Sequence, residues 1–164
     1  MLETPHVVVA AAIATKIANP LLAIPLALGS HFVLETVPHW NPHLNTEMKR
    51  FGKITKISTS IVTLDAFTAL FSGLFISSLA LPNLNHSATI LVACLFGVIP
   101  DLIEAPYYFL QGRLGFLGTS KKENGFIAKV WIPLQKSIQS DVPPFPGLLT
   151  QLATTLAAFW WILG

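Results

Sequence analysis

The sequence predicts an all-α fold, a polytopic membrane bundle of about five helices that forms a single domain over residues 1–164. Three observations predict it. Apolar residues make up 52% of the chain, and the mean hydropathy is +0.62. Charged residues make up 11%, against about 25% in an ordinary soluble domain. Residues 66–100 carry no charge at all. This composition excludes a disordered chain, a coiled coil and a nucleic-acid-binding tail, while the single cysteine, Cys94, excludes a disulfide framework.

The first two predicted helices are short. Residues 5–18 are apolar except for Lys16, and residues 20–37 are apolar except for Glu35. At a rise of about 1.5 Å per residue, a helix over the first segment is about 21 Å long, less than the hydrocarbon core of about 30 Å. We therefore expect two short or tilted helices, or re-entrant ones. A signal peptide is not expected, because the start of the chain lacks a basic segment.

The middle of the chain predicts a transmembrane hairpin. A polar turn over residues 82–86 separates helices over 61–81 and 88–109, and each is long enough to cross a bilayer. A third span is predicted over residues 143–164, which carry no charge and end near a tryptophan pair. Tryptophan is typical of the membrane interface, so this pair fits the end of a span.

Two polar segments, residues 41–58 and 111–142, hold nine of the ten basic residues. The positive-inside rule places both of these loops in the cytoplasm. The protein is then a multi-pass protein of the inner (plasma) membrane, with a cytoplasmic N-terminus and a C-terminus outside. Membrane lipid is the expected partner, no nucleic acid is expected, and a homo-oligomer is compatible with the small size of the chain.

Four acidic residues lie inside or beside apolar spans, near the predicted cytoplasmic ends: Glu35, Asp65, Asp101 and Glu104. At a helix centre each charge would cost about 2.5–3.5 kcal/mol. Carboxylates at similar depth repel one another, and Lys16 lies at the opposite end of its hairpin. Protons, the loop residues Lys49 and Arg50, or a metal ion must therefore supply positive charge.

The histidines favour a metal ion. Residues four apart share one face of a helix, so His31 and Glu35 can reach the same ion. His39 and His43 continue this spacing beyond two prolines, and His6 starts the first helix at the same membrane end. The predicted metal ligands are His6, His31, Glu35, His39, His43, Asp65 and Asp101. Imidazole and carboxylate groups suit Zn²⁺ first and also Mn²⁺ or Fe²⁺, and so many ligands suit one or two ions.

Taken singly, most of these residues also have a structural interpretation. His6 suits a helix start, and Asp101 follows Pro100 at a potential kink. Glu104 lies near two tyrosines and can extend to the interface. Asp65 is harder to explain structurally, because it lies within an otherwise uncharged span. The convergence of all these groups on one membrane end is what favours a site.

With these residues identified, the chain resembles a family of small bacterial inner-membrane metal-dependent hydrolases. The resemblance rests on Thr4-Pro5-His6 and on Pro100-Asp101-Leu102-Ile103-Glu104. The family motif has its second acid at the position of Ile103, so Glu104 departs from the pattern. One helix is also similar to that of zinc-dependent phospholipase C and the zinc single-strand nucleases, through His31, Glu35 and His39. Together the resemblances imply metal-assisted hydrolysis of a phosphoester, in a lipid or a similar molecule.

The sequence therefore predicts a membrane-embedded, metal-dependent hydrolase of a phosphoester or lipid-like substrate, acting at the cytoplasmic membrane face. Glu35 or Glu104 would be the general base, and Lys49 and Arg50 would hold a phosphate. Two other classes stay open. One is a transporter-like protein that conducts protons or metal ions through the same residues, and the other is a non-catalytic membrane scaffold.

Overall fold

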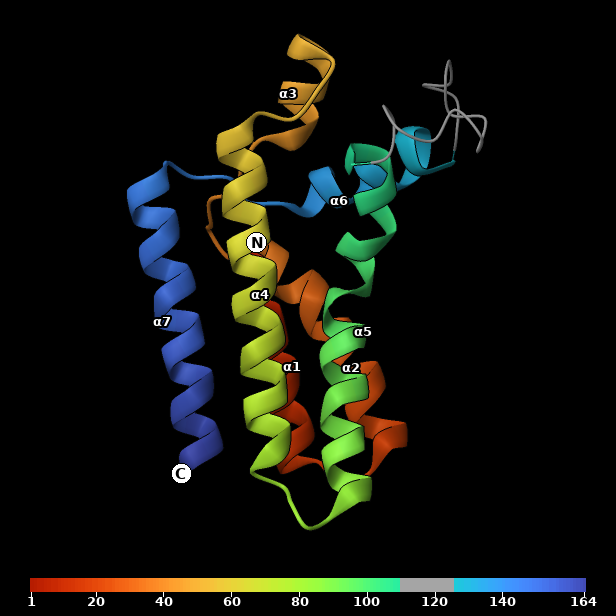
Figure 1. Cartoon of the computed structure of the whole chain (residues 1–164), viewed down its shortest axis with the longest axis vertical. Coiled ribbons are helices and arrows are strands. Elements are labelled where there is room, and N and C mark those ends of the chain that lie inside the picture. The colour runs from red at the N-terminus through yellow and green to blue at the C-terminus, as the bar shows by residue number, and fades with distance from the viewer. Residues whose placement is uncertain (110–125) are drawn as a thin grey trace.

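The computed structural model of the chain describes residues 1–109 and 126–164. Over these ranges 82% of the residues are helical and none forms a β-strand, which confirms the predicted all-α class. The described residues form seven α-helices and a π-helical turn, rather than about five helices (Figure 1). Part of the predicted loop 111–142, with Arg113, Lys121 and Lys122, lies outside the described residues.

The five apolar segments of the sequence all form helices. The first two are α1 (Glu3–Lys16) and α2 (Pro20–Thr36), which together make a short hairpin. The long hairpin consists of α4 (Lys56–Ser78) and α5 (Leu84–Phe109), and α7 (Pro144–Leu163) ends the chain. Three helices are long and apolar enough to cross a membrane: α4, α5 up to Tyr108, and α7.

Two short helices occupy segments that were predicted to be loops. Leu44–Phe51 forms α3, which ends at Gly52 in the left-handed conformation, with φ at 67°. Ile132–Ile138 forms α6, which follows the π-helical turn Ile127–Trp131 and has a proline in its first turn. Both helices are too short and too polar to be recognised from apolar stretches of spanning length.

Helix α1 is the centre of the bundle, because it contacts α2, α4, α5 and α7. Its side chains are small and apolar around the whole circumference, and Val8, Ala10, Ala11, Ala12 and Ala14 have no exposed surface. A helix that is apolar on every side is one that other helices surround, and small residues let those helices approach closely. The Val-Ala-rich sequence therefore explains why a helix this short is buried.

The chain begins at mid-height of the bundle, about halfway along α4 (Figure 1). From there α1 runs toward the end at which the C-terminus lies, and α2 returns to mid-height, whereas α4 and α5 continue well beyond both. Residues near the start of α1 and the end of α2 therefore meet inside the molecule. This arrangement places His6, His31 and Glu35 at the same level.

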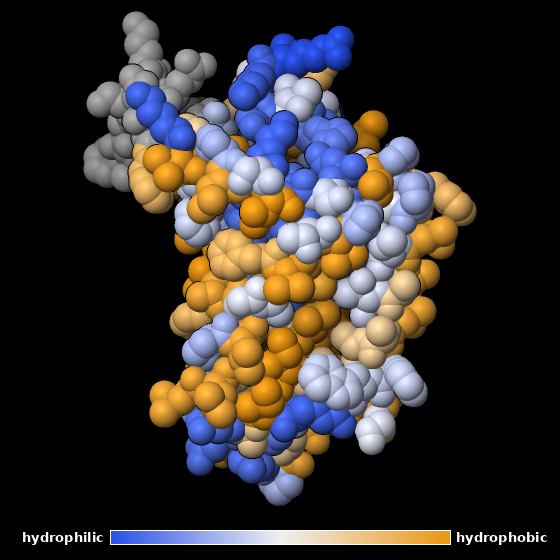
Figure 2. Space-filling model, turned by 180° about the vertical axis from the view of Figure 1, so that it is seen from behind, coloured by the Kyte–Doolittle hydropathy of each residue, from blue (hydrophilic) through white to orange (hydrophobic). Residues whose placement is uncertain are grey.

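The surface has a broad apolar belt between two hydrophilic ends (Figure 2). Exposed side chains such as Phe71, Leu156 and Trp160 contribute to the apolar exterior. Lys49 of α3 and Lys136 of α6 line one small hollow, so basic residues of the two polar segments lie at the same end. His86, at the start of α5, bonds instead to the carbonyl of Ala14 at the far end of α1, over 2.9 Å.

Candidate metal centre

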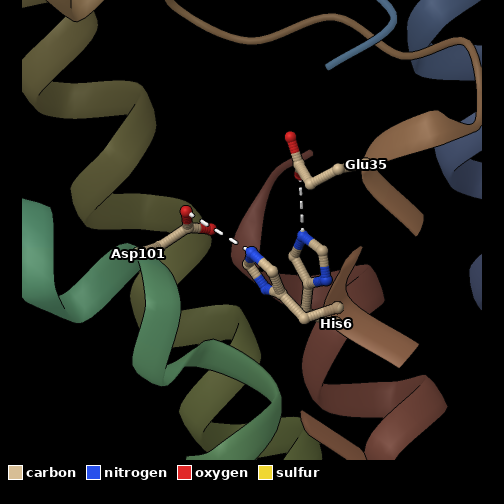
Figure 3. A group of neighbouring side chains, drawn as sticks. His6, Glu35 and Asp101 are labelled. Atoms are coloured by element: carbon tan, nitrogen blue, oxygen red, sulfur yellow. Dashed lines mark hydrogen bonds and ion pairs between the residues drawn. The ribbon is translucent and has the colours of Figure 1, made fainter. Parts of the chain in front are cut away.

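Four side chains from three helices converge in the interior. His6 comes from α1, Glu35 from α2 and Asp101 from α5 (Figure 3). The fourth residue, His31, is also on α2. One ligand atom of each lies within 4.8 Å of those of the other three. His6, His31 and Glu35 are buried, and the Asp101 side chain keeps 26% of its surface exposed. Two imidazoles and two carboxylates at this separation could hold a metal ion.

The contacts within this four-residue cluster are close. His6 Nε2 lies 3.2 Å from Glu35 Oε1, and His31 Nε2 lies 3.8 Å from Asp101 Oδ1. The two imidazole rings are stacked, with their centroids 4.2 Å apart. The carboxylates approach this stacked pair from two sides, as Figure 3 shows for Glu35 and Asp101.

A hydrogen bond to the backbone fixes the orientation of the His31 imidazole. His31 Nδ1 lies 2.9 Å from the carbonyl oxygen of Gly97, and a carbonyl can only accept, so Nδ1 carries the proton. The lone pair of His31 Nε2 therefore faces the cluster and is available to an ion. A ligating histidine in a metal site is typically held in this way by its second nitrogen.

The charges of the cluster also fit a cation. Among the described residues, neither Glu35 nor Asp101 forms an ion pair with a lysine or arginine; Glu35 pairs with the amino group of Met1 and with histidines. His6 Nδ1 is fully buried and has no hydrogen-bond partner in this part of the structure. An unpaired buried nitrogen costs about 1–3 kcal/mol, and neutral imidazole is a strong ligand for Zn²⁺. The donor set therefore fits a divalent metal.

His39 lies just outside the cluster. Its Nε2 is 3.6 Å from Glu35 Oε2 and 3.3 Å from the Gln139 amide nitrogen. His39 Nδ1 donates to the carbonyl of Val37 over 2.7 Å, and burial lowers the pKa of the ring below its ordinary value. Its backbone pairs with the segment after α6, through Ser140 and Val142. This pairing holds His39 beside Glu35.

Asp65, also predicted as a ligand, contacts the start of α1. Its carboxylate accepts hydrogen bonds from the backbone N–H groups of Glu3 and Thr4, over 2.5 and 3.3 Å, and from the Thr4 hydroxyl over 2.6 Å. It therefore caps the N-terminus of α1 from the side of α4, where a negative charge complements the helix dipole. The structure does not include Asp65 in the four-residue cluster.

The remaining predicted site residues are not members of the cluster. His43 is exposed at the start of α3, and Lys49 and Arg50 are exposed on the same helix. Arg50 lies over the ring of Phe51. Glu104 is one turn beyond Asp101 on α5 and accepts a hydrogen bond from Tyr108 over 3.3 Å. The other oxygen of Glu104 is buried without a partner among the described residues.

Two residues beside the cluster were not predicted from the sequence. The Gln135 amide nitrogen lies 3.4 Å from Asp101 Oδ1 and 3.3 Å from His31 Nε2, so α6 covers the cluster. Glu3 directs a carboxylate oxygen into the interior, where it has no partner in the described part of the chain. The only available signal for Glu3 was its position three residues before His6, and nothing in the sequence placed Gln135 near α2.

A cleft of about 740 Å³ adjoins the cluster. Glu35 and Asp101 line it together with Glu3, Asp65, Glu104 and Asp141. A long apolar part of its wall comes from α4 and α5, and residues 41–46 and α6 add polar side chains. Lys49 and Arg50 are not among its lining residues. The cleft gives a molecule from outside access to the two carboxylates of the cluster.

Comparison of the chain with protein families, with curated proteins and with solved structures finds no match. The geometry of the cluster and of the cleft is therefore the basis for assigning a function.

Proposed function

We propose that this chain is an integral-membrane, metal-dependent hydrolase that cleaves a phosphoester in a lipid-like substrate. The observation that carries the proposal is the convergence of His6, His31, Glu35 and Asp101 within 4.8 Å, at the edge of a large cleft. Buried ionisable groups in an apolar bundle are expensive and are commonly functional.

The proposed orientation follows from the distribution of charge. The apolar belt and the three long apolar helices support a multi-pass protein of the plasma membrane. Lys49 and Lys136 share a hollow at one end, and the positive-inside rule makes that end cytoplasmic. The cluster then lies in the cytoplasmic half of the bundle, with the C-terminus outside. The short α1–α2 hairpin then has its turn at the outer end and both of its open ends at mid-height.

In this proposal His6, His31, Glu35 and Asp101 would hold the metal ion, with Zn²⁺ as first choice and Mn²⁺ or Fe²⁺ as alternatives. A bound divalent ion supplies an acidified water and neutralises charge on a phosphoryl oxygen. Gly97 would hold His31 in the tautomer that ligates, through its carbonyl. Gln135 would fix Asp101 through an N–H donor.

Glu104 is the residue that we propose as general base. It lines the cleft next to Asp101, it is not one of the four clustered residues, and one of its oxygens has no partner. Its carboxylate would take a proton from the attacking water as the new P–O bond forms. It would return that proton to the leaving alcohol oxygen as the ester P–O bond breaks.

The packing below the cluster supports a hydrolase over a conducting protein. Between the cluster and the far end, the α1 face consists of Val8 and buried alanines, and Ile76 and Ile90 close the core there. A proton or ion relay would need polar groups through this region. The cleft instead adjoins the cluster at Glu35 and Asp101, which suits a substrate that enters and leaves by the same route.

Metal analysis of the purified protein by mass spectrometry tests the proposal. The wild type is expected to carry at least one transition metal per chain, and H31A and D101N are expected to lose it. H86A is the matched control, because His86 lies at the far end of the bundle and should leave the metal content unchanged. A second assay measures hydrolysis of a chromogenic phosphodiester, which E104Q should abolish without removing the metal. Wild-type protein without stoichiometric metal would refute the proposal.

A further inference from the structure

The cleft beside the cluster is amphipathic along its length. Its long wall is formed by apolar side chains of α4 and α5, with Val7 of α1 at its base. One end is acidic and comprises Glu3, Glu35, Asp65, Asp101 and Glu104. The principal wall residues are Leu70 and Leu74 on α4, and Leu91, Leu95 and Val98 on α5.

The wall residues are open rather than packed against each other. Leu70, Leu74 and Leu95 expose 56%, 46% and 49% of their surfaces although they flank the cleft. Both helices that carry them are long and apolar enough to span a bilayer. At this level the medium outside the helices is hydrocarbon, so an apolar groove between them is filled by hydrocarbon rather than by water.

The lining of the cleft favours a lipid over a small soluble anion as the main ligand. Six carboxyl groups line the cleft, Asp141 being the sixth, against Lys136 and the amino group of Met1 among the described lining residues. A free phosphoanion gains no binding energy from the apolar wall and meets like charges at the polar end. The head-group phosphate of a lipid meets the same carboxylates, but its acyl chain passes from one apolar environment to another and the bilayer supplies it at high local concentration.

We infer that the α4–α5 cleft binds one acyl chain of a membrane phospholipid and thereby aligns the head-group ester with the cluster of His6, His31, Glu35 and Asp101. This inference rests on the proposed function and specifies its substrate class. The groove contributes orientation more than affinity, because hydrocarbon packs similarly in the bilayer and in the protein. The acyl chain extends toward Val7, and the head group lies at Asp101 and Glu104.

Retention of lipid by the purified full chain tests this inference. The protein is treated with EDTA, so that the proposed metal-dependent hydrolysis cannot consume the lipid. It is then reconstituted with an equimolar mixture of dioleoyl phosphatidylethanolamine and dioleoyl phosphatidylglycerol, extracted into mild detergent, and examined by native mass spectrometry. The wild type is expected to keep one phospholipid per chain. L74W fills the groove, and its retained lipid should be about tenfold lower, as overpacking that costs about 1.4 kcal/mol implies.

Matched variants make the result specific. L95W blocks the opposite wall and should also lose lipid, which guards against misfolding of one variant. L64W adds the same bulk on α4 at an exposed residue that does not line the cleft, and it should retain lipid like the wild type. Equal retention by L64W, L74W and L95W, or no retained phospholipid in the wild type, would overturn the inference.

Metal content separates this inference from the proposed function. L74W should keep the wild-type metal content, and H31A should keep the lipid while it loses the metal. A wild type with lipid but without metal refutes the hydrolase alone. A wild type with metal but without groove-dependent lipid refutes the acyl-chain site alone.

Discussion

Asp65 is a half-buried carboxylate within an apolar helix, and its contacts are with the backbone. It accepts two backbone N–H groups and one hydroxyl at the start of α1, and no side chain of α1 satisfies those N–H groups. The cap fixes the point at which α1 begins, and His6 lies only three residues further on. Asp65 therefore positions the cluster through the backbone rather than through a bond to an ion.

Removing this cap should affect stability more than metal binding. D65A should lower the free energy of unfolding by about 1–2 kcal/mol, the usual cost of losing a helix cap. We expect its metal content to stay close to that of the wild type. Denaturation by SDS in mixed micelles, together with metal analysis, measures both quantities. Loss of the metal from D65A at unchanged stability would instead identify Asp65 as a ligand. D101A is the positive control, and we expect it to lose the metal.

The cluster residues predicted from the sequence are related by helix spacing or by the pairing of apolar segments. His31 and Glu35 are one helical turn apart, and a four-residue spacing predicts their meeting directly. His6 and Asp101 required only the assumption that apolar segments form antiparallel hairpins. Glu3 and Gln135 could not be found in this way, because their positions depend on where α1 begins and on how α6 folds back over α2.

At the scale of elements, Gly97 governs the approach of α5 to α1. A Cβ atom there would lie 2.8 Å from Ala10 Cβ and 3.2 Å from the His6 carbonyl oxygen. The same residue provides the carbonyl that orients His31. Gly97 thus has two roles. Its missing side chain permits the close helix contact, and its carbonyl orients the His31 imidazole.

G97A should force α1 and α5 apart and destabilise the protein by about 1–3 kcal/mol. It should also weaken metal binding, because the His31 acceptor moves. G29A is the matched control within α2, since nothing lies within 4 Å of its added Cβ. That change should be neutral or stabilising by up to about 1 kcal/mol. Equal stability of G97A and G29A would show that α1 and α5 can accommodate a methyl group at residue 97.

Glu47 connects α3 to the start of α4. Partial burial raises the pKa of its carboxyl, but hydrogen bonds from the Thr55 N–H and from the Ser58 hydroxyl, each 2.7 Å long, outweigh this effect. The pKa of folded Glu47 therefore lies below its ordinary value of 4.5. The ionised form is the one that stabilises the folded state.

The lowered pKa of Glu47 determines how its contribution to stability changes with pH. A carboxyl with a lowered folded pKa adds stability above its unfolded pKa, and the gain is lost as the pH falls through the folded value. The wild type should therefore exceed E47Q in thermal stability at pH 7, by less than about 1 kcal/mol because the group is largely solvated. The difference should shrink below pH 4.5. A difference that grows in acid would contradict the assignment.

The sequence anticipated the apolar elements well and the polar ones poorly. Long uncharged stretches specify α4, α5 and α7, because crossing a bilayer requires about 20 apolar residues. Segments such as Leu44–Phe51 form helices through caps and tertiary contacts, for which composition gives little signal. The cluster was predicted only in part for the same reason. The spacing of residues along one helix can be read from the sequence, whereas caps and covering segments depend on the tertiary structure.

At the scale of the whole molecule, the two hydrophilic ends should lie on opposite sides of the membrane. Cys94 is buried, so single cysteines introduced at exposed sites report their own accessibility. N85C, in the turn before α5, should react with a membrane-impermeant maleimide in intact cells. K53C, between α3 and α4, should react only after permeabilisation. The reverse pattern would invert the proposed orientation.

The apolar wall that α4 and α5 give the cleft has a kinetic consequence for the proposed function. A lipid that reaches the cleft from the bilayer diffuses in two dimensions, so its effective concentration is a mole fraction within the bilayer and not a molarity. Diluting the reactive lipid with an inert one should then slow turnover even when the amounts of protein and reactive lipid in the tube are unchanged. For the proposed hydrolase, the solvent in the kinetic sense is the membrane, because both of these helices are long and apolar enough to cross it.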